Sequence, residues 1–176
     1  MAGDHEDPTP PLRRHAALAP LSREHMSGLV QARNLVRASE ADEPARRRAA
    51  ADFLRVWDSE IREHFDDEER LLLPLTRDAA MRERLLSEHR DIRALSGSCR
   101  GSAGGPSPAV LKRLGTLLHD HIRWEERVLF EAVQHDHPGA LDSIVPEAAR
   151  IERQRPGARA RLRLDASGPG RTEPSS

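Results

Sequence analysis

The chain has 176 residues, enough for one domain with a substantial core, and its 28 Lys and Arg nearly balance its 29 Asp and Glu. The resulting net charge of −1 argues against a protein that binds nucleic acid through bulk charge. We expect no membrane span or secretion leader, and the single cysteine excludes an intramolecular disulfide framework, so the expected location is cytoplasmic. The chain contains nine histidines and no tyrosine.

Amphipathic segments between helix-breaking residues predict four helices, over about 22–39, 43–73, 78–95 and 107–134. Ser22, Asp78 and Ser107 are the expected N-caps, and Pro74 stops the second helix. The Ser/Gly/Pro-rich segment 96–108 is expected to be a loop up to the start of the fourth helix.

Strand signals are missing, since no alternating β-branched run occurs. We therefore predict an all-α, up-down-up-down four-helix bundle over residues 20–135. A flexible N-terminal arm (1–19) precedes it in this prediction. Residues 136–176 follow, with a short helix from Pro146 and a disordered tail rich in Arg, Gly and Pro.

Helix periodicity identifies the inward positions, because side chains three and four residues apart share a face. The inward stripe of the second helix is Leu54, Trp57, Ile61, His64, Glu68 and Leu71. The inward stripe of the fourth helix is Leu111, Leu114, Leu118, His121, Glu125 and Val128. In each stripe a histidine precedes a glutamate by four residues. The first and third helices each add one inward histidine, His25 and His89.

These polar inward positions predict a metal site. A lone histidine on an apolar face is usually a hydrogen-bonded core residue, but here six polar residues face inward from four helices. Burying carboxylates without partners costs several kcal/mol, and no Lys or Arg lies in the same stripes. A bound cation removes this cost. The predicted ligands are His25, His64, Glu68, His89, His121 and Glu125.

The ligand set favours a pair of metals. Six nitrogen and oxygen ligands exceed what one zinc uses, whereas two metals could each take two imidazoles and share the glutamates. Imidazole and carboxylate without sulfur suit iron or manganese, and ligand type alone leaves copper and cobalt open. The ferritin-like Glu-x-x-His pattern and the metalloprotease His-Glu-x-x-His string are both absent.

The predicted ligands lie in four short motifs, LSREH, HFDDEERLLLPL, SEH and HIRWEERVLF, in this order within residues 20–135. This ordered set resembles the hemerythrin-like (HHE cation-binding) family. The resemblance implies a four-helix bundle around an oxo- or hydroxo-bridged di-iron centre that meets dioxygen or peroxide. It also implies that Glu68 and Glu125 bridge the metals, with His25 and His64 on one iron and His89 and His121 on the other.

Two positions depart from the oxygen-carrying members of that family. Those proteins have a further histidine one turn after the third-helix ligand, where this chain has Arg93, and an aspartate where it has Glu125. An open metal position favours redox reaction or sensing over reversible carriage. A nearby carboxylate or His119 could instead fill the missing position, although His119 and His121 point to different helix faces.

Residues beside the predicted ligands have less specific expectations. Glu69 and Glu126 should be solvated or paired with arginine. Cys99 should lie in the Gly/Ser-rich loop, where a redox-sensing thiol is one reading and an incidental cysteine the simpler one. The Arg-rich tail should act as a solubilising segment.

The leading functional hypothesis is a di-iron protein that binds or reacts with dioxygen, peroxide or a related small oxidant, with catalase- or peroxidase-like turnover as its enzymatic version. Manganese or a mixed metal pair remains an alternative cofactor. The rival hypotheses are a non-enzymatic iron or oxygen sensor or iron-handling protein, and a di-iron oxygenase acting on an organic metabolite. The expected partner is a small molecule, with no nucleic acid and no membrane, and the oligomeric state stays open.

Overall fold

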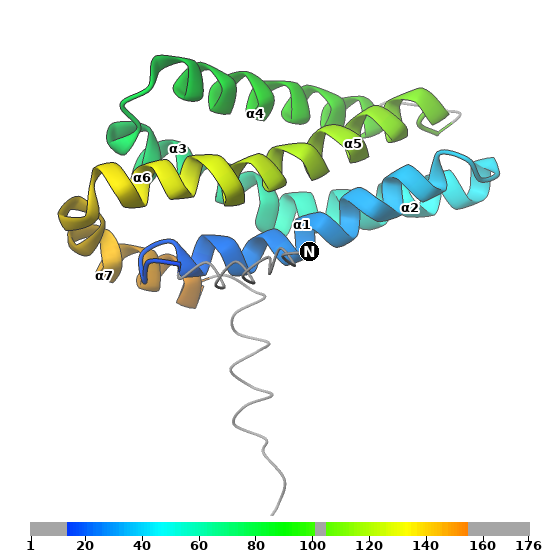
Figure 1. Ribbon diagram of the computed structural model, residues 1–176. Helices are drawn as coiled ribbons and strands as arrows, with labels where there is room; N and C mark the ends of the chain where they lie inside the picture. Colours follow the sequence, from blue (N-terminus) through cyan, green and yellow to red (C-terminus); the bar gives the residue numbers. More distant parts are fainter. Residues whose placement is uncertain (1–13, 101–104, 155–176) are drawn as a thin grey trace, which may run out of the picture.

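The computed structural model describes residues 14–100 and 105–154, and within these ranges the chain is helical with no strand, as predicted. Four antiparallel helical rods follow one another up, down, up and down (Figure 1). Within the described ranges, no helix is both long and apolar enough to cross a membrane. The predicted tail beyond residue 154 and the arm before residue 14 lie outside the described residues.

We name the four rods A to D in chain order. Rod A is α1 (Ala19–Ala38), and rod C is α4 (Ala79–Arg100). Rod B joins α2 (Glu43–Val56), the π-helical turn η1 (Trp57–Ile61) and α3 (Arg62–Leu72), and the 3₁₀ turn η2 (Leu73–Leu75) follows it. Rod D joins α5 (Pro108–Trp124), the π-helical turn η3 (Glu125–Leu129) and α6 (Phe130–Asp136).

Two of the three expected N-caps are confirmed. The side chain of Asp78 accepts a hydrogen bond from the Met81 backbone N–H, with an oxygen–nitrogen distance of 3.0 Å. Ser107 caps α5 in the same way. The expectation for Ser22 is wrong, because α1 begins at residue 19 and Ser22 lies inside its first turn. Pro20 stands at the start of that helix, where its fixed φ suits a first turn and its missing N–H costs nothing.

Rod C is longer than predicted, since α4 continues through residues 96–100, which were expected to be a loop. The buried Ser96 hydroxyl donates a 2.7 Å hydrogen bond to the Ile92 carbonyl, which keeps this polar side chain satisfied within the helix. Cys99 is therefore not a loop residue. Its side chain is only 7% exposed and packs into the core.

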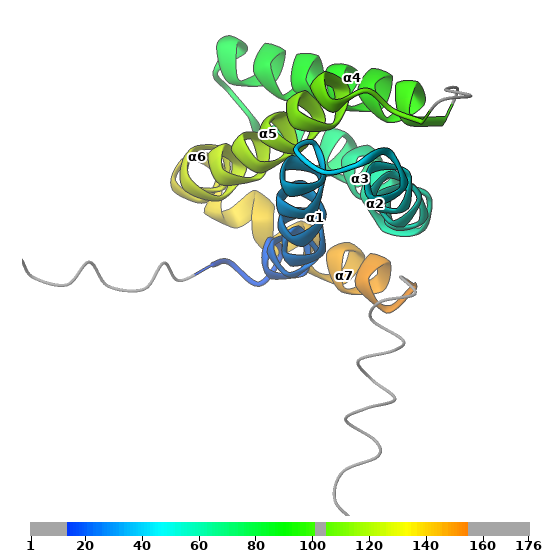
Figure 2. The same cartoon turned by 90° about the vertical axis from the view of Figure 1, so that its right-hand side faces the viewer.

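A fifth helix, α7 (Pro138–Gln154), follows rod D after a one-residue break. It starts at Pro138 rather than at the expected Pro146, which lies inside the helix. Leu141 is fully buried, and α7 lies against the beginning of α1 (Figure 2). There Arg23 of α1 forms an ion pair with Glu152, with a nitrogen–oxygen distance of 2.7 Å.

The π-helical turn η3 changes which residues of rod D face the core. A π-helical turn holds one extra residue, so the positions after it shift by one around the helix. Leu129 is fully buried, whereas Val128, which the regular period predicts to face inward, is 39% exposed. The second π-helical turn, η1, ends at Ile61 and lies just before the polar positions of rod B.

The apolar core consists of two clusters separated by a polar layer. One cluster contains Ala32, Phe53, Ile61, Ile92 and Leu118, and the other contains Leu21, Leu71, Leu85, Leu129 and Phe130. On each rod the predicted ligands lie between a residue of the first cluster and a residue of the second. The fold therefore brings the polar positions of four rods to one level of the bundle.

Rods A and D approach each other closely at Gly115. A Cβ atom at this position would lie 2.6 Å from the backbone oxygen of Ala32 and 2.8 Å from a methyl group of Val36. Only glycine permits this backbone separation. The contact fixes the spacing of the two rods less than two helical turns before His121.

Candidate metal centre

The structure brings all six predicted ligands together inside the bundle. They are buried, with exposed fractions of 4% or less, and every rod contributes at least one of them. The six residues form two overlapping groups whose side-chain nitrogen and oxygen atoms lie close enough to hold metal ions. The groups are His25, His64 and Glu68, and Glu68, His89, His121 and Glu125.

The first pair of imidazoles comes from rods A and B. Nε2 of His25 lies 3.3 Å from Oε1 of Glu68, and Nε2 of His64 lies 3.2 Å from the same oxygen. Nε2 of His25 also lies 3.3 Å from Oε2 of Glu125 on rod D. Both carboxylates therefore present an oxygen atom to this pair.

The second pair comes from rods C and D and uses the opposite oxygens. Nε2 of His121 lies 3.0 Å from Oε1 of Glu125, and Nε2 of His89 lies 3.7 Å from it. Nε2 of His89 also lies 3.5 Å from Oε2 of Glu68. Each carboxylate thus points one oxygen at each imidazole pair, the arrangement that bridging between two metals requires.

The donor set contains buried polar atoms that a bound cation would satisfy. Six of its buried nitrogen and oxygen atoms have no hydrogen-bond partner among the residues that the structure describes: Nε2 of His64, His89 and His121, Oε2 of Glu68, and both carboxylate oxygens of Glu125. Within the described residues, the ion pairs of the two glutamates are with histidines, not with Lys or Arg. Buried groups of this kind are costly unless a cation satisfies them.

The same proximity shifts the pKa values. Burial alone lowers the pKa of His64, but the charge of Glu68 and the hydrogen bond with Glu24 outweigh burial and raise it to about 9. Burial is likewise outweighed at His89, where the nearby carboxylates of Glu125, Glu68 and Glu69 raise the pKa to about 10. The pKa of Glu125 is lowered well below its ordinary value, because nearby histidines outweigh its burial. A metal must displace protons from these imidazoles when it binds.

Four further glutamates hold the outer nitrogens of the ligand imidazoles; we call Glu24, Glu69, Glu88 and Glu126 the outer glutamates. The Nδ1-to-carboxylate distances are 2.6 Å for His25 with Glu126, 2.8 Å for His64 with Glu24, 2.8 Å for His89 with Glu69 and 2.8 Å for His121 with Glu88. A carboxylate on Nδ1 fixes the tautomer and the ring orientation and leaves Nε2 for a metal.

The outer glutamates form a closed ring around the centre. Rod A supplies the acid for the histidine of rod B, rod B for rod C, rod C for rod D, and rod D for rod A. Each outer glutamate is the direct sequence neighbour of a predicted ligand. This adjacency, Glu-His twice and Glu-Glu twice, is the sequence signal that points to them.

Arginines neutralise three of the outer glutamates. The nitrogen–oxygen distances are 2.7 Å for Arg93 with Glu69, 2.8 Å for Arg84 with Glu88 and 2.6 Å for Arg14 with Glu126. The expected arginine pairing of Glu69 and Glu126 is confirmed. Each of these two glutamates also contacts the imidazole of a predicted ligand, which was not expected.

Neither Arg93 nor His119 extends the set of six predicted ligands. The Arg93 guanidinium binds Glu69 and Asp66 and lies 5.7 Å from the ring centre of Phe65. His119 does not fill the position either, because it is exposed and its Nδ1 lies 2.9 Å from Oδ1 of Asp120. Within the described residues, the groups able to hold a metal contain only the six predicted ligands.

Comparison with protein families agrees with this geometry. Residues 16–133 match the family described as the hemerythrin HHE cation binding domain. Comparisons with curated proteins and with solved structures gave no match. The matched segment contains all six predicted ligands, all four outer glutamates and most of the four rods. The chain therefore belongs to the hemerythrin HHE cation-binding domain family, and its buried His/Glu groups form a candidate di-metal site.

Proposed function

We propose that this chain is a non-haem di-iron protein that binds dioxygen or peroxide and reacts with it. The observation that carries the proposal is the sharing of two carboxylates between two imidazole pairs, one oxygen to each pair. A donor set of nitrogen and oxygen without sulfur suits iron and also manganese. Bound iron would supply the electrons for reducing the oxidant.

The protein supplies the positions of the donors and a dry surrounding. The ring of Phe65 stacks on His89 with ring centres 3.8 Å apart, and Phe130 stacks on His25 at 5.5 Å. Both phenylalanines are almost completely buried, so they keep water from the imidazoles. The outer glutamates hold each imidazole in one orientation, and their charge makes Nε2 a stronger donor.

One feature favours reaction over reversible carriage. The two imidazole pairs are alike, since Arg93 provides no third histidine for the pair formed by His89 and His121. Neither metal would then be saturated by protein ligands, and open positions are what metals need for chemistry.

The space beside the site favours a very small substrate. A cavity lined by His25 and His64 has a volume of about 10 Å³, room for about one water-sized molecule. Dioxygen and hydrogen peroxide, with two oxygen atoms each, are far closer to this size than an organic metabolite. The oxygenase alternative therefore has no support from this cavity.

Metal analysis with an optical spectrum tests the proposal. We expect about two irons per wild-type chain and absorption bands of an oxo- or hydroxo-bridged pair. The variants His64→Ala and Glu125→Ala should lose the bands and most of the iron, while the exposed control His119→Ala keeps both. Full iron content in both ligand variants would contradict the assigned ligands, and a loaded wild-type protein that does not consume peroxide would contradict the reaction.

A further inference from the structure

The imidazole of His25 lies in a group of side chains that includes a largely buried arginine. Its Nδ1 lies 2.6 Å from Oε1 of Glu126, and Nη2 of Arg14 donates to Oε2 of the same carboxylate, also at 2.6 Å. The Arg14 guanidinium donates as well to the backbone oxygen of Glu126 and to Oε1 of Glu131. The ring of Phe130 stacks on His25, and the guanidinium lies 5.2 Å from the centre of that ring.

The imidazole of His89 has the same kind of surroundings, built from other rods. Its Nδ1 lies 2.8 Å from Oε1 of Glu69, and Nη1 of Arg93 donates to this same oxygen at 2.7 Å. Nη2 of Arg93 donates to a second carboxylate, that of Asp66. Phe65 stacks on His89, and the guanidinium lies 5.7 Å from the centre of the Phe65 ring. An outer glutamate, an arginine, a second carboxylate and a phenylalanine therefore occur at each of these two imidazoles.

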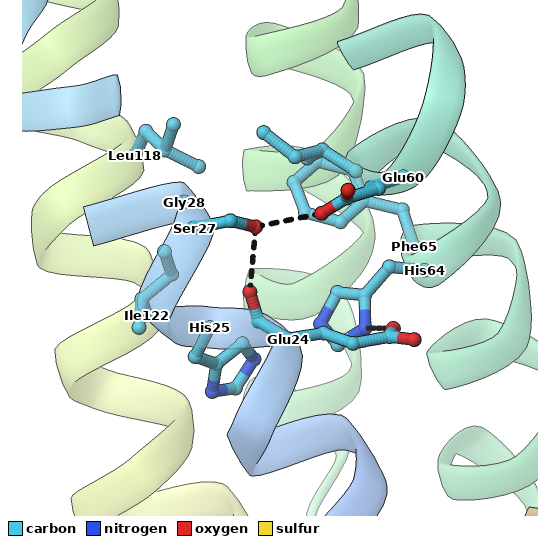
Figure 3. A pocket seen from close by; sticks show the side chains of 10 residues that line it. Glu24, His25, Ser27, Gly28, Glu60, His64, Phe65, Leu118 and Ile122 are labelled. Carbon is cyan, nitrogen blue, oxygen red and sulfur yellow. Dashed lines mark hydrogen bonds and ion pairs between the residues drawn. The ribbon is translucent and has the colours of Figure 1, made fainter. Parts of the chain in front are cut away.

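The two arginines belong to different imidazole pairs. Arg14 reaches His25, whose ring centre lies 4.9 Å from that of His64 in the pair of rods A and B (Figure 3). Arg93 reaches His89 in the pair of rods C and D. If each pair holds one metal, each metal has one guanidinium that is connected to it through an outer glutamate and an imidazole.

The charge around the pairs gives these arginines an effect on the metals. Six glutamate carboxylates border the imidazoles, the two shared ones and the four outer ones. Negative charge stabilises ferric iron more than ferrous iron, because the attraction grows with the charge of the ion. An outer carboxylate also makes Nε2 of its imidazole a stronger donor. A guanidinium bound to that carboxylate opposes both effects and so favours the ferrous state.

We propose that Arg14 and Arg93 raise the reduction potential of the metal pair, one arginine acting on each metal through its outer glutamate. The inference rests on the proposed function, in which the ferrous state supplies the electrons for the oxidant. Both arginines are positioning residues, since they touch outer glutamates and not the metals. Arg14 lies before the segment 16–133 that matches the HHE family, so the family match assigns it no role.

Solvent screens these charges to different degrees. The exposed fractions of the side chains are 12% for Arg14, 33% for Arg93 and 44% for Arg84, which binds the outer glutamate Glu88. Water around an exposed charge weakens its action at a distance. We therefore expect the effect on the potential to be largest for Arg14 and smallest for Arg84.

A redox titration of the full iron-loaded chain measures the potential. Dithionite gives one electron to each ferric ion, which becomes ferrous, and the absorption of the ferric pair reports the midpoint. In Arg14→Gln we expect the ferrous-to-ferric ratio at a fixed potential to fall about 10-fold, which is about 59 mV for a one-electron step. Arg93→Gln should shift the midpoint in the same direction by less, and the double variant should show the sum of both shifts. The control Arg90→Gln makes the same charge change at an exposed position and should match wild type.

Two further variants separate the charge of Arg14 from its support of the fold. Arg14→Lys keeps the charge without the fork of donors, and it should restore most of the midpoint. Glu131→Gln removes the second carboxylate of Arg14. It should raise the midpoint, because negative charge is lost, whereas an arginine that only supports the fold would be loosened and the midpoint would not rise.

Binding of Zn²⁺ to the metal-free chain gives a readout without redox chemistry, by competition with a chelator. Arg14→Gln removes positive charge near the metal, so its zinc affinity should equal or exceed that of wild type. Weaker zinc binding, a midpoint in Arg14→Gln at or above the wild-type value, or no recovery in Arg14→Lys would overturn the charge role alone. A wild-type chain that holds no iron would overturn the proposed function and this role with it.

Discussion

The carboxylate of Glu24 lies 2.8 Å from Nδ1 of His64, although Glu24 is the sequence neighbour of His25 on another rod. Glu88 behaves in the same way. It is the sequence neighbour of His89, but its carboxylate lies 2.8 Å from Nδ1 of His121 on the next rod. A residue next to one ligand thus orients a ligand on the following rod. The positions of the imidazoles consequently depend on the packing of all four rods, not on any one helix.

Loss of an outer glutamate should weaken metal binding without removing a ligand. In Glu88→Gln, the imidazole of His121 loses its charged partner, and we expect metal affinity to fall about 10- to 100-fold. Competition with a chelator of known affinity measures this change. Glu83→Gln is the matched control, because it makes the same charge change at an exposed position of α4. Equal affinities of the two variants would contradict the orienting role of Glu88.

Metal removal should lower the stability of the fold. The fully buried Glu68 and Glu125 repel each other, and a cation that binds only the folded state stabilises it. At a free iron concentration 100 times the dissociation constant, the expected gain is about 2.7 kcal/mol in the free energy of unfolding. Denaturant unfolding of chelated and iron-loaded protein under anaerobic conditions gives this difference. The gain should be absent in Glu68→Gln; the same gain there would place the stabilising metal elsewhere.

Two glycines in helices should respond in opposite ways to alanine. At Gly115 a methyl group would meet the backbone oxygen of Ala32 at 2.6 Å, so Gly115→Ala should push rods A and D apart and cost about 1–3 kcal/mol. A Cβ atom at Gly97 would meet no atom of the described residues within 4 Å, so Gly97→Ala should gain about 0.5–1 kcal/mol through helix propensity. Thermal and denaturant unfolding measure both. A destabilised Gly97→Ala would contradict the continuous helix at residues 96–100.

The thiol of Cys99 should react slowly with alkylating reagents in the native protein. Its burial raises the pKa of the thiol above the ordinary cysteine value, so the reactive thiolate forms only at more alkaline pH. We expect alkylation of native protein at pH 8 to be much slower than alkylation of unfolded protein, and to accelerate as pH rises through the elevated pKa. Rapid alkylation of the native chain at pH 8 would revive the redox-sensing interpretation of this residue.

The sequence predicts the bundle and the inward positions of the six His and Glu residues well, because both follow from helix periodicity. His64 and Glu68 occupy one helix face whatever the neighbouring rods do, and so do His121 and Glu125. Val128 is predicted wrongly because the π-helical turn after Trp124 has no signal in the apolar pattern. The end of α4 is missed since small polar residues such as Ser96 resemble a loop until their burial is known.

The contacts of the outer glutamates could not be predicted from the sequence. Glu69 lies next to Glu68 and off the inward stripe, which predicts a solvated side chain. Its contact with His89 depends on the distance and rotation between rods B and C. Sequence periodicity describes one helix at a time and contains neither quantity.

The closure of the outer ring has a consequence for synthesis of the chain. Three of the orienting contacts join residues 20, 33 and 40 positions apart, but the contact between His25 and Glu126 spans 101 positions. A nascent chain that has not reached residue 126 lacks this contact, and one that ends before Glu125 also lacks a shared carboxylate. Under the proposed function, a chain truncated before Glu125 should therefore not hold the metal pair, and only a chain with all four rods should do so.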